Sequence, residues 1–279
     1  MTPIVDFGKE LLRSFDLDPI YIALNRIELP EYKRARWLVA YWCFYHAGVA
    51  SWMSDVRRGG DYYWGYMDNA ARNILSAPTP QKTWPRGTER RHFRGKAAVR
   101  AVAELASCYP DAIYMLDYLC DAGPLDIKSV MERAQTHTMF GPWIAFKVAD
   151  MLDAVWGVEV DQRDVSAFLY DSPRKSIEEC CANDEVEIMC TKEDEPVKAM
   201  GWLQHQLRNY RIPHKLKMAP DYFALETIWC KHYSHRHGHY PLYKDIKEIR
   251  HGLEPWVEHS RTAGLFLEAM PKAPLFGRS

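Results

Sequence analysis

The sequence predicts an all-α fold made of two helical lobes with a cleft. Large apolar side chains recur at helical spacing in its clearest stretch, at Trp37, Tyr41, Phe44, Tyr45 and Trp52. No pair of strand-like segments interrupts the helical patterns elsewhere. A hydrophobic content of 47% over 279 residues is enough for a sizeable core.

The helical patterns follow one another along the chain. The first long run, 31–57, ends at Gly59-Gly60 and is the expected spine of the first lobe. The other expected helices are 62–76, 96–108, 111–121, 126–135, 142–156, 162–170, 196–210, 220–234 and 254–269. We expect one catalytic domain over 1–279, with lobes at approximately 1–121 and 122–279 and an acidic surface excursion at 182–195.

Charge is unevenly distributed, although the formal net charge is only −1. Residues 80–100 carry seven Lys or Arg against one Glu, whereas residues 178–195 carry eight Asp or Glu against one Lys. A concentrated basic segment is typical of phosphate binding. The neutral total therefore does not exclude a polyanionic partner.

The cysteines and the longest uncharged run bear on the compartment. Seven cysteines without paired spacing indicate reduced thiols, as in a cytoplasm. The run from Trp37 to Met53 has no Asp, Glu, Lys or Arg, but it contains His46 and Gly48 and is short for a membrane span. We expect a cytoplasmic protein with no membrane partner.

Residues 126–151 are typical of two short helices joined by a tight turn. Pro142 stands at the first helical position after Gly141, where proline is favourable. A helix N-terminus exposes N–H groups that a DNA phosphate can accept. The residues expected to contact the DNA backbone are Thr138, Phe140, Gly141 and Trp143.

This segment resembles the helix-hairpin-helix of the DNA glycosylase superfamily, whose hairpin ends in glycine. Val160-Asp161 follows Gly141 where that superfamily places its active-site aspartate, so the resemblance implies a catalytic Asp161. The alternative is that Asp161 caps a helix beginning near Gln162. Two positions depart from the pattern. Met139 stands where the hairpin usually has its first glycine, and Trp143 replaces the lysine that forms an imine in bifunctional glycosylases.

The loop from Trp84 to Gly95 combines clustered arginines with a histidine, glycines and aromatic flanks. Arginine forks match phosphate oxygens in a bidentate manner, so this composition suits a pyrophosphate or a DNA backbone. The alternative is a solvated loop whose arginines pair with the acidic excursion.

Four segments together resemble the phage amino acid:DNA transferase family, which is related to the α-glutamyl/putrescinyl-thymine pyrophosphorylases. They are Tyr41 to Ala50, Trp84 to Gly95, Gly141 to Met151, and Glu226-Thr227 with Cys230-Lys231. The resemblance covers roughly residues 10–255. It implies an enzyme that acts after a DNA kinase has pyrophosphorylated 5-hydroxymethyluracil, and that replaces the pyrophosphate with the amine of an amino acid, glycine in the best-understood pathways. The implied partners are double-stranded phage DNA, an amino acid and, functionally, the kinase, and no cofactor is implied.

This chemistry gives each candidate residue a role. Arg90, Arg91 and Arg94 would stabilise the departing pyrophosphate, with His92 as a proton donor. Asp161 would accept the proton of the amine or stabilise positive charge on the exocyclic carbon. The further substrate-binding candidates are Arg86, Trp84 and Phe93 in the loop, the aromatic pair filling or stacking in the vacated site, and Glu226 and Lys231.

The histidine-rich segment raises the question of a metal. Cys230 with His235 or His237 has no two-plus-two ligand spacing, so we expect no metal. Two other functions stay open. One is a monofunctional DNA glycosylase that uses Asp161 to activate water, and the other is a non-catalytic DNA-binding module.

Overall fold

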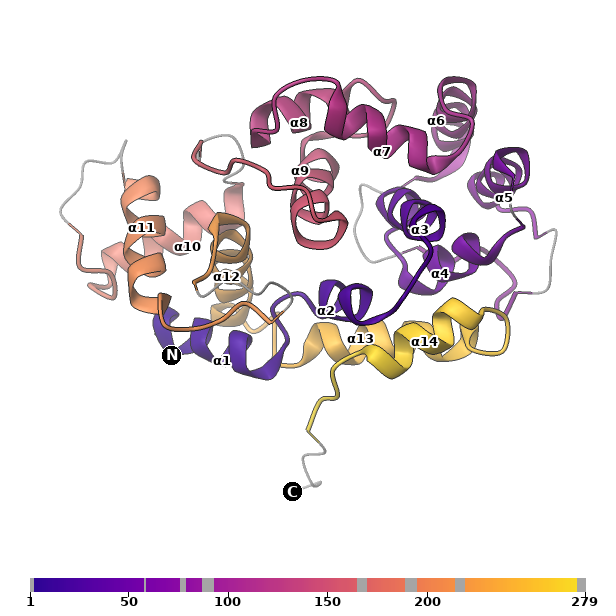
Figure 1. The fold of residues 1–279 in the computed structure, drawn as a ribbon. Helices are drawn as coiled ribbons and strands as arrows, with labels where there is room; N and C mark the ends of the chain where they lie inside the picture. Colours follow the sequence, from indigo (N-terminus) through magenta and orange to yellow (C-terminus); the bar gives the residue numbers. More distant parts are fainter. Residues whose placement is uncertain are drawn as a thin grey trace. The chain divides into compact units, whose positions relative to one another are not determined.

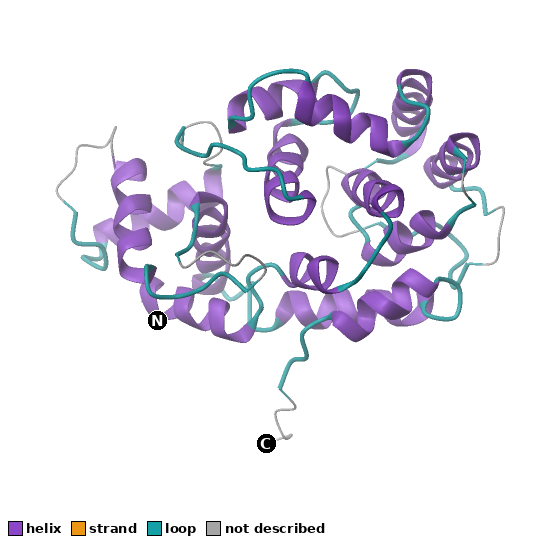
Figure 2. Cartoon of the chain, in the orientation of Figure 1, coloured by secondary structure: helices purple, strands orange, loops and turns teal. Residues whose placement is uncertain are grey.

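The computed structural model describes residues 3–57, 59–75, 79–86, 93–164, 170–188, 195–213 and 219–274 (Figure 1). Throughout these ranges the regular secondary structure is helical, as the colouring in Figure 2 shows, so the all-α prediction is confirmed. No helix within them has both the length and the apolar character needed to cross a membrane.

The chain divides into two compact units, and the first comprises Met1–Ile22, Asp161–Lys247 and Pro271–Ser279. Its helices are α1 (Ile4–Ser14), α10 (Asp171–Ala182), α11 (Glu195–Leu207) and α12 (Tyr222–Arg236). Helix α12 packs against the other three. Its buried residues, among them Ile228 and Trp229, occupy several sides of the helix, as expected of a helix surrounded by protein.

The second unit comprises Ala23–Val160 and Glu248–Met270. Helix α3 (Glu31–Phe44) is its centre, because it packs against α4 (Ala47–Asp55), α7 (Ala112–Asp121) and α9 (Pro142–Met151). Every residue of α3 from Ala35 to Phe44 is buried. The remaining elements are α5 (Gly60–Arg72), α6 (Gly95–Cys108), α8 (Ile127–Gln135), a π-helical turn at Leu152–Trp156, a 3-10 turn at Glu254–Trp256 and α14 (Arg261–Ala269).

Two helices belong to both units. Helix α2 (Pro19–Arg26) and helix α13 (Lys244–Leu253) each begin in the first unit and end in the second. The predicted lobe boundary after residue 121 falls inside the second unit, so this division does not follow it.

The expected single helix over 31–57 is two helices. Tyr45 takes a left-handed conformation with φ 50° and donates its N–H to Tyr41 O, which ends α3. His46 Nδ1 then accepts from Val49 N at 3.3 Å and caps α4. A Cβ added to Gly48 would lie 2.3 Å from the Trp256 ring, so this position requires glycine.

The expected helix over 162–170 is not found where the structure describes it. Residues 162–164 are not helical, and 165–169 lie outside the described residues. The acidic excursion expected at 182–195 follows α10, which itself includes the acidic pair Glu178 and Glu179. Helix α10 was missed because polar residues outnumber its buried ones, such as Ile177 and Cys180.

Candidate functional site

The two helices that flank the turn between α8 and α9 both have favourable residues at their N-termini. Asp126 accepts from Ser129 N at 2.9 Å and caps α8, while Gly141 precedes Pro142 at the start of α9. Met139 has a φ of 71°, a left-handed conformation that glycine adopts with less strain. Gly141 is exposed, so the first turn of α9 presents its N-terminus to solvent.

The side chains of this turn divide into buried and exposed groups. Phe140 is buried edge-on against Phe93, with ring centroids 5.7 Å apart, so its predicted contact with DNA is limited to its backbone. The half-buried Trp143 packs on Tyr45 at 4.9 Å. Thr138 is exposed, and its hydroxyl bonds Glu104 and lowers the pKa of that carboxyl.

The arginine-rich loop is clamped at its two ends by Arg86. The Arg86 guanidinium donates to Phe93 O at 2.5 Å, to Trp84 O at 3.0 Å and to Ala70 O at 3.0 Å. Burial, followed by the nearby charge of Arg94, lowers the pKa of Arg86. Arg86 therefore holds the two ends of the loop together, and its binding of substrate stays a prediction.

Two aromatic side chains of the loop lie in the core, which corrects their predicted stacking role. Trp84 is 2% exposed, and its indole N–H donates to Ile74 O at 3.1 Å. Phe93 is fully buried, and its N–H donates to Cys43 O at 2.7 Å. Neither ring has surface available to a nucleobase. The exposed Arg94 precedes α6, whereas Arg90, Arg91 and His92 lie outside the described residues.

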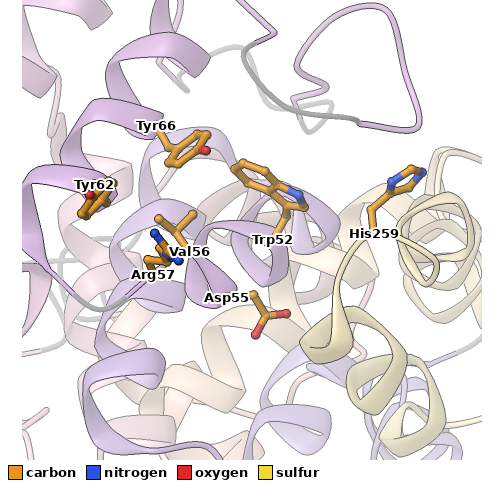
Figure 3. Close-up of a pocket in the computed structure, with 7 residues that line it drawn as sticks. All are labelled: Trp52, Asp55, Val56, Arg57, Tyr62, Tyr66 and His259. Carbon is orange, nitrogen blue, oxygen red and sulfur yellow. The ribbon is translucent and has the colours of Figure 1, made fainter.

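A pocket of about 320 Å³ lies beside Trp84 in the second unit (Figure 3). Trp52, which lines it, meets the Trp84 ring edge-on at 5.2 Å and the Tyr66 ring edge-on at 4.9 Å. This pocket was not predicted from the sequence. Tyr62 and Tyr66, spaced four residues apart on α5, were the signal that could have indicated it. The lining residues are Trp52, Asp55, Val56, Arg57, Tyr62, Tyr66 and His259.

Asp55 forms a satisfied part of the pocket wall. Its carboxylate accepts from Lys33 Nζ at 2.7 Å, Ser260 Oγ at 2.8 Å, and both the N–H and the hydroxyl of Thr262 at 2.9 and 2.8 Å. Burial alone would raise the pKa of Asp55, but these hydrogen bonds lower it. Asp55 is therefore an ionised group that ties α4 to the start of α14.

Asp161 carries a partly exposed carboxylate that forms an ion pair with Arg163. The guanidinium of Arg163 donates to both carboxylate oxygens of Asp161, and its backbone N–H donates to one of them at 3.0 Å. These hydrogen bonds lower the pKa of Asp161. Since residues 162–164 are not helical, Asp161 does not cap a helix beginning near Gln162. The arrangement keeps Asp161 ionised at neutral pH.

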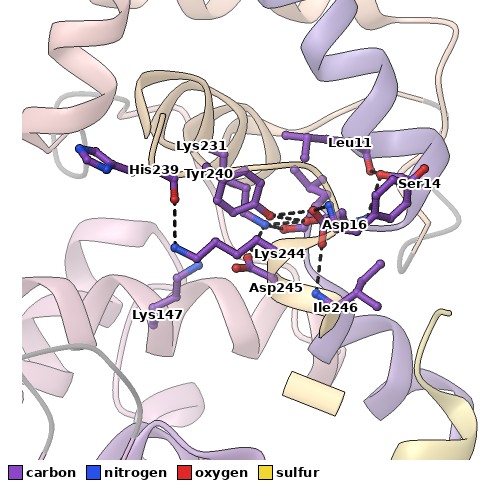
Figure 4. Close-up of polar contacts among 12 residues, drawn as sticks. Leu11, Ser14, Asp16, Lys147, Lys231, His239, Tyr240, Lys244, Asp245 and Ile246 are labelled. Carbon is purple, nitrogen blue, oxygen red and sulfur yellow. Dashed lines mark hydrogen bonds and ion pairs between the residues drawn. The ribbon is translucent and has the colours of Figure 1, made fainter. Parts of the chain in front are cut away.

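Lys231, predicted to bind substrate, belongs to a network of buried and half-buried groups (Figure 4). Its Nζ donates to Asp16 O at 2.6 Å and to Leu17 O at 2.7 Å, and pairs with Asp245 at 2.6 Å. The Asp16 carboxylate accepts from Tyr240 OH at 2.9 Å, and burial raises its pKa. With its donors used in this way, Lys231 joins α12 to the chain after α1.

Glu226, the other candidate on α12, is 6% exposed and offers little surface to a DNA substrate. Its binding of substrate stays a prediction.

A group of possible metal ligands lies elsewhere in the first unit. Among the described residues, Cys180, Glu185 and His232 bring their ligand atoms within 4.8 Å of one another. The Nη1 atom of Arg236, however, donates to Cys180 Sγ at 3.1 Å and pairs with Glu185 at 2.9 Å. Burial raises the pKa of Cys180 to about 12, which favours the thiol over the thiolate that binds metal. Arg236 thus supplies the positive charge of this cluster. We assign the cluster a structural role.

The two histidines considered with Cys230 have partners of their own. His235 Nδ1 lies 2.8 Å from Tyr240 O, and His237 Nε2 lies 3.1 Å from Glu179. Cys230 is half-buried on the same helix. The absence of a metal stays a prediction.

An arginine-rich segment and an exposed helix N-terminus are features of proteins that bind phosphate groups. The sequence model of the amino acid:DNA transferase family matches residues 13–239, and the chain belongs to this family. It is 38% identical to a glycinyltransferase of Pseudomonas phage PaMx11, over 96% of each chain. It is 21% identical to a putrescinyltransferase of Delftia phage PhiW-14, over 62% of this chain and 52% of that protein. The predicted class of enzyme, an amino acid:DNA transferase, is confirmed.

Proposed function

We propose that this enzyme replaces the pyrophosphate of 5-pyrophosphoryloxymethyluracil in phage DNA with the amine of glycine. The observation that carries the choice of glycine is the 38% identity to a phage glycinyltransferase across 96% of both chains. The more distant putrescinyltransferase indicates that related chains use other amines. A DNA kinase that pyrophosphorylates 5-hydroxymethyluracil would supply the substrate.

The reaction exchanges one bond for another at the exocyclic carbon. The carbon–oxygen bond breaks with its electron pair leaving on pyrophosphate, and the neutral amine forms the new carbon–nitrogen bond and then loses a proton. Negative charge grows on the leaving oxygens, where Arg90, Arg91 and Arg94 would act, with His92 as a proton donor. The clamp made by Arg86 supports this role, because it fixes both ends of the segment that contains them.

Asp161 would stabilise the positive charge on the reacting carbon. Its lowered pKa suits this electrostatic role better than the role of a base, because a carboxylate of low pKa accepts protons weakly. Arg163 would orient the carboxylate through its paired hydrogen bonds. Asp161 in this proposal contacts the reacting atoms, whereas Arg163 acts through it.

The turn between α8 and α9 would bind the DNA backbone as a helix-hairpin-helix of the glycosylase-like superfamily, in a two-lobed enzyme with a cleft. The left-handed Met139 supports this, because it stands at the position where the hairpin of that superfamily has a glycine. The exposed N-terminus of α9 and the exposed Thr138 would face the phosphates.

The test is to incubate the protein with 5-hydroxymethyluracil DNA, pretreated with a DNA kinase, and isotopically labelled glycine. Mass spectrometry of the digested nucleosides should show a thymidine that carries the label on its methyl carbon, together with free pyrophosphate. Release of free base would identify a glycosylase instead. DNA binding without either product would leave a non-catalytic module.

A further inference from the structure

We propose that the pocket lined by Trp52, Tyr62 and Tyr66 binds one unstacked nucleobase of the DNA substrate, with Arg57 at the adjoining phosphate. This proposal rests on the proposed action on DNA and adds a binding site to it. Three partly exposed aromatic rings, an arginine and a histidine gather there from α4 and the residues just after it, from α5, and from the segment before α14 (Figure 3).

The aromatic rings offer π surface that the core does not use. Tyr62 is 55% exposed, and Trp52 and Tyr66 are half-buried with ring planes 77° apart. Trp52 also packs edge-on against Trp84, and this second aromatic contact holds its ring in place. Every nucleobase has a π face, so such rings bind bases with little regard to sequence.

The charges of the pocket favour an anionic ligand over a free amine. Asp55 is the acidic group in the wall, and four donors already satisfy its carboxylate. Arg57 is exposed, and its backbone is held because Arg57 O accepts from buried Arg36 at 3.1 Å. A guanidinium beside aromatic rings suits a phosphate attached to a planar base.

The volume and location of the pocket favour a nucleotide within DNA. About 320 Å³ is at the small end of ligand pockets, a size suited to a single nucleotide. Trp52 contacts Trp84, the first residue of the arginine-rich loop, so the pocket lies where that loop leaves the core. A base bound here would lie beside the start of a segment whose sequence is strongly basic.

The test compares three oligonucleotides with the intact protein: a paired duplex, the same duplex with one unpaired thymine, and a single strand. Tyr62→Ala should weaken binding of the last two about 10-fold, the scale of one lost base stack, and binding of the paired duplex less than about 2-fold. Tyr62→Phe should restore affinity because the ring is retained. Tyr114→Ala is the matched control, since Tyr114 is 52% exposed on α7 in the same unit.

Photo-crosslinking gives an independent measurement. A 5-iodouracil at the unpaired position should crosslink to peptides that contain Trp52, Tyr62 or Tyr66. Thymidine monophosphate at millimolar concentration should not displace the unpaired-thymine duplex. Displacement by the mononucleotide would make this a site for free nucleotides and overturn its assignment to DNA.

Equal affinities of Tyr62→Ala and the parent protein for all three oligonucleotides, with crosslinks elsewhere, would overturn the site. Binding and crosslinking require no turnover, so they separate the two proposals. A crosslinked pocket in a protein that does not transfer glycine would leave the site standing and overturn the proposed reaction. Glycine transfer with crosslinks outside the pocket would support the proposed reaction and overturn the site.

Discussion

Arg36 and Asp111 form a two-pronged ion pair inside the second unit, in which the Arg36 side chain is fully buried. The same guanidinium donates to Val56 O and Arg57 O, both at 3.1 Å, so it fixes the end of α4. Asp111 also accepts from Ala112 N and caps α7. The pair therefore links α3, α4 and α7, and sets the backbone position of Arg57 in the pocket.

Removing the carboxylate should be costly, because it leaves a buried charge without its partner. Asp111→Ala should lower the free energy of unfolding by about 3–5 kcal/mol, measured by urea denaturation. The matched control is Asp68→Ala, which removes an exposed pair with Arg72 on α5 and should cost about 0.5 kcal/mol or less. Similar small losses in both variants would show that carbonyl oxygens alone satisfy Arg36.

Lys231 is expected to affect stability rather than substrate binding. Lys231→Met leaves the carbonyl oxygens of Asp16 and Leu17 without their donor and should lower the free energy of unfolding by about 3 kcal/mol. Lys247→Met, at an exposed position of α13, should change it by less than about 0.5 kcal/mol. A folded Lys231→Met protein with normal stability and weakened DNA binding would restore the substrate role predicted from the sequence.

His46 should make stability depend on pH. Burial lowers its pKa from 6.5 to about 4, so the folded protein holds the neutral ring while the unfolded chain becomes protonated. The corresponding stability is present above pH 6.5 and is lost as the pH falls to about 4, a loss of about 3 kcal/mol. Denaturation curves across this range should show it.

The substitution His46→Asn isolates this titration, because asparagine also caps helices and does not titrate. The variant should lose less stability between pH 6.5 and 4 than the parent protein. His251→Asn, on an exposed side chain of α13, should retain the parent's pH dependence. Identical profiles for all three proteins would mean that His46 is not the responsible group.

Asp161 should matter for chemistry more than for folding. Its ion pair with Arg163 is largely exposed to solvent, so Asp161→Asn should leave the free energy of unfolding nearly unchanged, while removing most single-turnover activity. Glu159→Gln, an exposed neighbour, should leave both unchanged. A fully active Asp161→Asn enzyme would exclude Asp161 from the reaction.

Sequence patterns predicted helices well where apolar residues recur along one face of the helix and residues typical of helix ends follow. The expected helices 96–108, 111–121 and 126–135 differ by one residue at most from α6, α7 and α8. Patterns failed at a local break in the backbone and at a contact between residues far apart in the sequence. The left-handed Tyr45 that splits 31–57 is not visible in periodicity, and Lys231 lies 215 positions from its acceptor at Asp16.

The same reason explains which residues of the arginine-rich loop pack into the core or anchor it. Trp84, Arg86 and Phe93 lie among polar neighbours, and their sequence context indicates a solvated loop. Their burial depends on the core between α3 and α5, which supplies Cys43 O to Phe93 and Ala70 O to Arg86. Local composition predicted the basic loop but not which of its members anchor it.

Arg91 offers the sharpest test of the leaving-group hypothesis, although it lies outside the described residues. The six residues from 87 to 92 are bracketed by Arg86 and Phe93, which are joined by a 2.5 Å hydrogen bond. An arginine that stabilises the leaving group would act mainly in the transition state, because charge accumulates on the bridging oxygen only as its bond to carbon breaks.

Arg91→Ala should therefore lower the single-turnover rate by about 10²-fold, the scale for losing one preorganised donor, with a much smaller effect on DNA affinity. Arg91→Lys should recover part of the rate, because an ammonium keeps the charge and loses the fork. Lys82→Ala, at an exposed position of the same basic segment, controls for general loss of positive charge. If Arg91→Ala and Lys82→Ala weakened DNA binding equally and left the rate at saturating DNA unchanged, the loop would be a backbone clamp. The departing pyrophosphate would then need another source of positive charge, and the exposed Arg94 at the start of α6 would be the next residue to replace.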